Sequence, residues 1–131
     1  MAKVLVVEDS AAVRLAVTEV IEEAGHEVVE AENGRIAIGL LDGGATFDLI
    51  VTDVLMPEAD GVEVIKAARR LNPGTQVLAM SGGAPNLPAG YALKMAEMFA
   101  ADAVLYKPFL NDELRKAVAR LLSSTDGDAA D

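Results

Sequence analysis

Five short apolar segments alternate with longer amphipathic segments along the chain, and no other feature of the sequence restricts the fold as strongly. The short segments are rich in valine, isoleucine and leucine and are bounded by polar or turn residues, which is typical of β-strands. They lie at residues 4–7, 27–31, 48–52, 76–80 and 103–106. The amphipathic segments predict one helix that ends at Gly25 and further helices at residues 33–41, 61–71, 91–99 and 110–122.

This alternation, with short connections, predicts an α/β fold in which helices cover both faces of a five-stranded, doubly wound parallel sheet. The continuous apolar runs VLVV, LIV and VLAM are suited to central strands, whereas the more polar EVVEA is suited to an edge. At 131 residues the chain has room for one domain. We predict that it covers residues 1–122 and that residues 123–131 form a flexible acidic tail.

Composition excludes several classes of function. The chain has no cysteine, which rules out disulfides, thiolate metal sites and a thiol nucleophile, and fits a reducing cytoplasm. With 21 acidic against 11 basic residues, the net charge of −10 disfavours binding to nucleic acid. Every apolar run is shorter than the ~18 residues of a membrane span. A soluble cytoplasmic protein with no nucleic-acid or membrane partner is expected.

Polar residues that could bind a ligand or take part in a reaction follow the ends of the predicted strands. Glu8 and Asp9 follow the first strand, Asp53 the third, Ser81 the fourth and Lys107 the fifth. In an open parallel sheet, ligands bind beyond the carboxyl ends of the strands. Neighbouring strands are only ~4.8 Å apart, so these side chains are expected to converge at one edge of the sheet.

The predicted cluster of carboxylates requires a cation, because like charges in a partly buried site raise one another's pKa. Oxygen ligands without histidine or cysteine favour Mg²⁺. Lys107 and Ser81 could then contact further oxygens of a phosphoryl group. Asp53 remains as a nucleophile, because carboxylates can accept phosphoryl groups as acyl phosphates.

These residues belong to a longer series of motifs in a fixed order. The series is Glu8-Asp9, then Asp53 with Met56-Pro57 and Gly61 after it, then Ser81, then Lys107-Pro108-Phe109. From residue 3 to residue 122, the chain resembles the receiver domain of bacterial two-component response regulators. The resemblance implies a flavodoxin-like fold with strand order 2-1-3-4-5.

The resemblance also implies roles for individual residues. Asp53 would accept a phosphoryl group from a histidine kinase or a histidine phosphotransfer protein. Asp9, Asp53 and the backbone carbonyl of Leu55 would bind Mg²⁺, with Glu8 acting through a water molecule. The Lys107-Pro108 peptide bond would be cis.

A switching face built from the fourth helix, fifth strand and fifth helix is a further implication. Ser81 would move toward the phosphoryl group and reorganise this face. The family often has an aromatic residue where this chain has Val104. Tyr106 lies on the same strand face by the period of two, and we hypothesise that it takes over part of the switching role. The loop at residues 82–91 is longer than is usual in the family. In the family, the residues two positions after the phosphoacceptor and two after the hydroxyl residue tune the lifetime of the acyl phosphate. Here they are Leu55 and Gly83, which cannot orient an attacking water molecule, so slow hydrolysis of the acyl phosphate is expected.

Other functions remain open at this point. A phosphatase of the haloacid dehalogenase type would place its nucleophile after the first strand, with a second acid two residues on, whereas Glu8 and Asp9 are adjacent. A flavin or dinucleotide site would need glycine in the loop EDSAAVR. A non-phosphorylated interaction module, a phosphorelay intermediate and a phosphate sink are further alternatives.

The sequence favours a stand-alone receiver over these alternatives. Such a domain is not a classical enzyme, because it catalyses only its own phosphorylation and dephosphorylation. We expect a monomer or weak dimer with an unknown downstream protein target.

Overall fold

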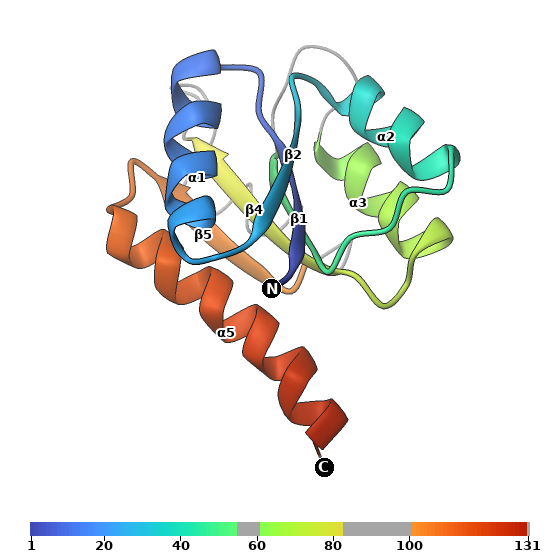
Figure 1. The fold of residues 1–131 in the computed structure, drawn as a ribbon. Coiled ribbons are helices and arrows are strands. Elements are labelled where there is room, and N and C mark those ends of the chain that lie inside the picture. The colour runs from blue at the N-terminus through green and yellow to red at the C-terminus, as the bar shows by residue number, and fades with distance from the viewer. Residues whose placement is uncertain (55–60, 83–100, 131) are drawn as a thin grey trace.

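The computed structural model describes residues 1–54, 61–82 and 101–130 of the chain, and their side chains as far as Ser123. Within these residues, five parallel strands form one sheet in the order β2-β1-β3-β4-β5 (Figure 1). The strands are β1 (Lys3–Val7), β2 (Glu27–Ala31), β3 (Leu49–Asp53), β4 (Gln76–Gly82) and β5 (Ala103–Lys107). The predicted fold class, the strand order and the edge position of residues 27–31 are therefore confirmed.

Three of the described helices connect successive strands from β1 to β4, and the fourth follows β5. They are α1 (Ala11–Glu23), α2 (Gly34–Asp42), α3 (Gly61–Leu71) and α5 (Asn111–Ala130). The predicted helix at residues 91–99 and most of the predicted loop at residues 82–91 lie outside the described residues. No helix among the described residues is long and apolar enough to cross a membrane.

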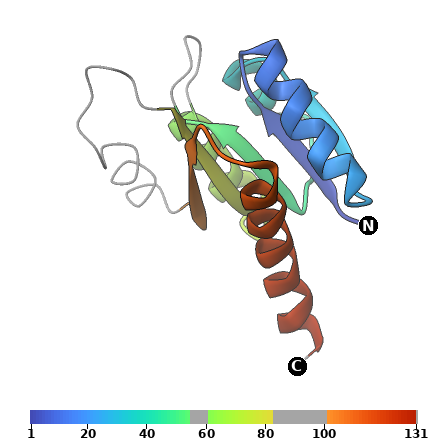
Figure 2. The same cartoon turned by 90° about the vertical axis from the view of Figure 1, so that its left-hand side faces the viewer.

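Two apolar cores lie on opposite faces of the sheet. Val4 and Val6 of β1 pack with residues of α1 and α5. The alternate residues Leu5 and Val7 pack with residues of α2 and α3. In Figure 2, α1 and α5 lie in front of the sheet. Burial of both faces explains why the central strands consist of uninterrupted apolar residues.

The C-terminal helix differs from the prediction. The sequence predicted that it ends at Leu122, but α5 continues to Ala130 and extends beyond the sheet (Figure 1). The stretch contains no proline, and its single glycine, Gly127, costs a helix only about 1 kcal/mol. Nothing in this stretch therefore forces the helix to end at Leu122.

Candidate functional site

Strand register brings the predicted site residues to one edge of the sheet. Val7 pairs with Thr52 at the ends of β1 and β3, so the next residues, Glu8 and Asp53, lie side by side. Asp53 is the last residue of β3 and pairs with Met80 of β4. The sequence had placed Asp53 just after this strand. Its backbone belongs to the ladder, which fixes the position of the carboxylate.

The start of α1 directs the chain away from the acidic residues. Ser10 is the N-cap of this helix, and its hydroxyl oxygen accepts a hydrogen bond from the Val13 N–H at 3.4 Å. The Ser10 N–H donates to Glu8 Oε2 at 3.2 Å. One residue therefore both begins the helix and holds the Glu8 carboxylate.

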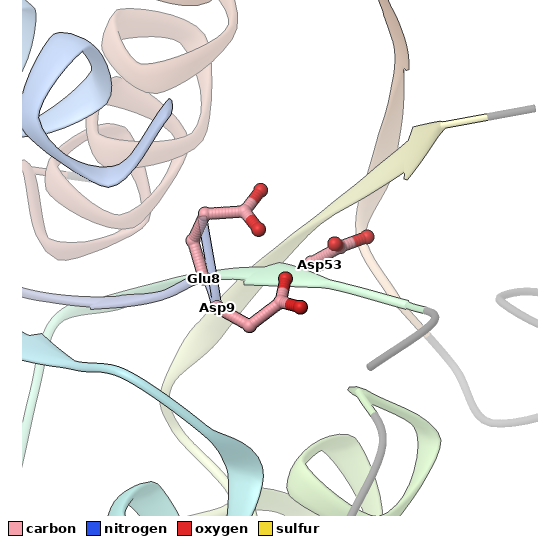
Figure 3. A group of neighbouring side chains, drawn as sticks. All are labelled: Glu8, Asp9 and Asp53. Carbon is pink, nitrogen blue, oxygen red and sulfur yellow. The ribbon is translucent and has the colours of Figure 1, made fainter. Parts of the chain in front are cut away.

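Three carboxylates form a compact cluster beyond β1 and β3. One oxygen from each of Glu8, Asp9 and Asp53 lies within 4.8 Å of the others (Figure 3). Glu8 is only 1% exposed and Asp53 is also buried, whereas Asp9 is exposed. Carboxylate oxygens are the donors that a hard divalent cation prefers, so this donor set fits Mg²⁺. The predicted convergence of these three residues is confirmed.

Lys107 supplies a positive charge to the cluster. It is the last residue of β5, and its Nζ atom lies 3.3 Å from Asp53 Oδ2. Lys107 also forms a closer ion pair with Glu8 Oε1. The Lys107-Pro108 peptide bond is cis, as the resemblance implied. The sequence predicted the proximity of Lys107 to Asp53 but missed its ion pair with Glu8. The signal in the sequence is that residue 8 is a glutamate, whose side chain is one methylene group longer than that of an aspartate and so can reach Lys107.

Burial and charge together set the protonation of this pair. Burial raises the pKa of the Glu8 carboxyl group, and the hydrogen bond from Lys107 offsets only part of that rise, so the pKa stays above its ordinary value. Burial alone would lower the pKa of the Lys107 ammonium group. Its hydrogen bond to Glu8 and the charge of Asp53 outweigh that effect and raise the pKa. The Lys107 side chain is therefore protonated and positively charged at neutral pH.

Gly61 allows α3 to begin against the end of β3. Its N–H donates to the Val54 carbonyl at 2.9 Å. A Cβ atom at this position would lie 2.0 Å from the backbone oxygen of Asp53, a distance that real Cβ atoms do not show. The sequence identified Gly61 only as part of a family motif, and the close approach to Asp53 gives its physical reason. Glycine at residue 61 thus allows α3 to pack directly against the backbone of Asp53, the predicted phosphoacceptor.

The predicted switch residues lie on adjacent strands. Ser81 is buried near the end of β4 and pairs with Tyr106 of β5. Tyr106 is 48% exposed, whereas Val104 packs against a small apolar cluster that contains Val54. Leu55 and Gly83, for which the resemblance implied roles, and the motif residues Met56 and Pro57 lie outside the described residues.

The doubly wound sheet in this strand order, with acidic groups beyond its carboxyl edge, defines a flavodoxin-like α/β domain. The sequence matches the response regulator receiver domain family over residues 4–119. The chain belongs to this family of two-component signalling domains.

Individual relatives are similar over most of the chain. The response regulator receiver protein CpdR of Brucella abortus is 31% identical, and the match covers 93% of this chain and 98% of CpdR. The chemotaxis protein CheY4 of Vibrio cholerae is 34% identical with a TM-score of 0.80, over 93% of this chain and 99% of that structure. The sensor kinase CckA of Brucella abortus is 33% identical over 95% of this chain, which spans 13% of CckA. The chain also spans less than half the length of other curated relatives that it matches.

Proposed function

We propose that Asp53 accepts a phosphoryl group from a histidine kinase or a histidine phosphotransfer protein in a Mg²⁺-dependent reaction. The observation that carries this proposal is the position of the Asp53 carboxylate. It is buried at a strand end, beside two further carboxylates and 3.3 Å from a lysine ammonium group. Two buried carboxylates, Glu8 and Asp53, share this one ammonium group, and a buried charge without full compensation is costly, so the arrangement favours a role in which the negative charge is used.

The proposed transfer exchanges one bond for another at phosphorus. An Asp53 carboxylate oxygen forms a bond to the phosphorus atom, while the phosphorus–nitrogen bond of the donor phosphohistidine breaks. The imidazole nitrogen leaves with the bonding electron pair and takes up a proton. Catalysis of such a transfer consists mainly of positioning and charge neutralisation, and that is what the surrounding residues can supply.

Each neighbouring residue has a proposed role. Asp9, Asp53 and the Leu55 carbonyl would bind Mg²⁺, and Glu8 would act through a water molecule. Mg²⁺ in this position would neutralise charge on the phosphoryl oxygens. Lys107 would exchange its contact with Glu8 for one with a phosphoryl oxygen. Its present distance from Asp53 supports this role, because little movement is needed.

Ser81 would transmit phosphorylation to a protein-binding face. That face would comprise the predicted helix at residues 91–99, which lies outside the described residues, together with β5 and α5. The register supports this proposal, since Ser81 pairs with Tyr106 and the Tyr106 side chain is half exposed to a potential partner. Movement at the buried serine would thus be coupled to a ring on the surface. Val104, on the same strand, is partly buried against the small apolar cluster that contains Val54, and would belong to the switch with Ser81 and Tyr106.

The relatives support the proposed partners. CckA is a sensor kinase and CpdR is a response regulator receiver protein, so chains similar to this one occur both in a kinase and in a receiver protein. A histidine kinase or phosphotransfer protein is therefore the proposed phosphoryl donor. The domain would act as a phosphoacceptor that catalyses only its own phosphorylation and dephosphorylation.

The proposal is tested by incubating the protein with Mg²⁺ and acetyl phosphate and measuring its intact mass. We expect one added phosphoryl group in the wild type, none without Mg²⁺, and none in Asp53→Asn. Circular dichroism of Asp53→Asn establishes that the variant is folded. An equal mass gain in the wild type and in folded Asp53→Asn would refute the assignment of Asp53.

A further inference from the structure

Arg14 of α1 contacts the backbone of the acidic cluster. Its Nη1 atom donates to the Glu8 carbonyl oxygen at 2.8 Å. Its Nε atom lies 3.3 Å from Glu30 Oε1 on the edge strand β2. The side chain is only 18% exposed. A long, flexible side chain that is held at two points in this way has lost most of its freedom, which indicates a defined position.

The carbonyl that Arg14 contacts belongs to the peptide unit joining Glu8 to Asp9. On the other side of Glu8, its N–H donates to the Ala31 carbonyl at 3.1 Å. The backbone of Glu8 is therefore fixed at both polar groups, by β2 and by Arg14. The orientation of this peptide unit determines the position of the Asp9 Cα atom. The contact from Arg14 therefore also limits the directions in which the exposed Asp9 side chain can point.

The positive charge of Arg14 is paired with Glu30, so its contribution to the site is to hold the backbone rather than to attract Mg²⁺. Lys107 neutralises part of the negative charge through Glu8 and Asp53. Among the described residues no ion pair holds Asp9, so its position depends on the backbone that Arg14 contacts at the Glu8 carbonyl. Side chains that hold metal ligands in place through hydrogen bonds contribute strongly to metal affinity.

We propose that Arg14 is a positioning residue for the Mg²⁺ site: it fixes the Glu8-Asp9 peptide unit so that the Asp9 carboxylate is ready to bind the cation with Asp53. Glu30 holds the guanidinium in place from the edge strand. This inference rests on the proposed function, because it assigns Arg14 to the same site. Arg14 touches neither the phosphoryl donor nor the acceptor atom, so its effect should appear in Mg²⁺ affinity rather than in the rate at saturating Mg²⁺.

The test is isothermal titration of the full chain with Mg²⁺ alone, followed by phosphorylation with acetyl phosphate at increasing Mg²⁺. For Arg14→Ala we expect Mg²⁺ to bind about tenfold more weakly, the lower end of the effect of losing a group that orients a metal ligand. The Mg²⁺ concentration for half-maximal phosphorylation should rise by the same factor. The rate at saturating Mg²⁺ should stay at the wild-type level, which a general structural defect would not produce.

Two variants serve as controls. Arg70→Ala removes an exposed arginine of α3, whose ion pair partner is Asp42, and so produces the same change in net charge. Glu30→Gln weakens the second contact of Arg14 but leaves the donor to the Glu8 carbonyl. We expect Arg70→Ala to bind Mg²⁺ like the wild type, and Glu30→Gln to lie between the wild type and Arg14→Ala. Equal losses in Arg70→Ala and Arg14→Ala would indicate net charge alone and overturn the inference.

The outcomes separate this inference from the proposed function. If the wild type and folded Arg14→Ala bind Mg²⁺ equally, the positioning role is wrong and the proposed function stands. If the wild type binds no Mg²⁺, both are wrong. Should Arg14→Ala fail to fold, Arg14→Lys decides the question, because it keeps the charge but not the planar two-point contact. An affinity equal to that of the wild type in Arg14→Lys would then overturn the inference.

Discussion

Substituting Gly61 by alanine should destabilise the protein and impair phosphorylation together. The added Cβ atom would lie 2.0 Å from the Asp53 backbone oxygen and 2.7 Å from Val54 Cα. Both are backbone atoms at the end of β3, and the Gly61 N–H is bonded to the Val54 carbonyl. Rotation of a side chain cannot relieve this overlap. The end of β3 and the start of α3 must separate instead.

The size of the effect follows from these distances. Carbon atoms pack at about 3.5–4.0 Å, so relief requires a movement of more than about 1 Å. Overpacking typically costs 1–3 kcal/mol when side chains can adjust. Because the obstruction here is backbone, we expect the free energy of unfolding to fall by about 3 kcal/mol. The same movement displaces Asp53, so the rate of phosphorylation by acetyl phosphate should fall as well.

Gly39→Ala is the matched control for Gly61→Ala. Gly39 lies within α2, and a Cβ atom there would meet no atom within 4 Å. Alanine favours the helix over glycine by roughly 0.5–1 kcal/mol, so Gly39→Ala should stabilise the protein. Urea denaturation of both variants measures the difference. A Gly61→Ala protein as stable as the wild type, or a shift of stability in the same direction for both substitutions, would contradict the predicted overlap with the Asp53 backbone.

Three further predictions concern the charged cluster and the switch. Lys107→Ala removes the cation paired with two buried carboxylates, so in metal-free buffer it should lower the free energy of unfolding by about 3 kcal/mol. An unchanged free energy of unfolding, measured by urea denaturation, would show that these ion pairs do not stabilise the fold. Because the folded-state pKa of Glu8 is raised above its ordinary value of 4.5, the folded state holds the Glu8 proton more tightly than the unfolded state does. The resulting stabilisation is present below pH 4.5 and is lost as the pH rises through the folded-state pKa of Glu8. The metal-free wild type should therefore lose stability relative to Glu8→Gln between acidic and neutral pH. Parallel profiles of stability against pH for the two proteins would contradict this prediction. In Tyr106→Ala, phosphorylation should change hydrogen exchange across residues 91–99 less than in the wild type, and an equal change would exclude Tyr106 from the switch.

The fold could be predicted largely because its signals are local. Valine-rich runs and helical spacing predict the strands and most helices, and Asp53 is a predicted site residue because a carboxylate at the end of a buried strand needs compensation. The strand order came from a family resemblance, since local patterns do not state which strands pair. The predicted end of α5 was wrong because the sequence has no strong stop signal near Leu122, and the helix continues to Ala130.

The contacts within the site were harder to predict, because they join residues far apart in the sequence. The ion pair between Lys107 and Glu8 depends on the relative heights of β1 and β5, which are not neighbours in the sheet. The contact from Arg14 to the Glu8 carbonyl depends on how α1 turns after Ser10. The close approach of Gly61 to Asp53 depends on where α3 meets β3. The sequence shows which groups are present, but packing decides which of them meet.

The central claim is that Asp53, and no other carboxylate of the cluster, receives the phosphoryl group. Borohydride reduces an aspartyl phosphate to homoserine, which peptide sequencing by mass spectrometry locates to a single residue. After reaction with acetyl phosphate and Mg²⁺, the account predicts homoserine at residue 53, with Glu8 and Asp9 unchanged. Modification at residue 8 or 9, or no modification under conditions in which the protein binds Mg²⁺, would contradict it.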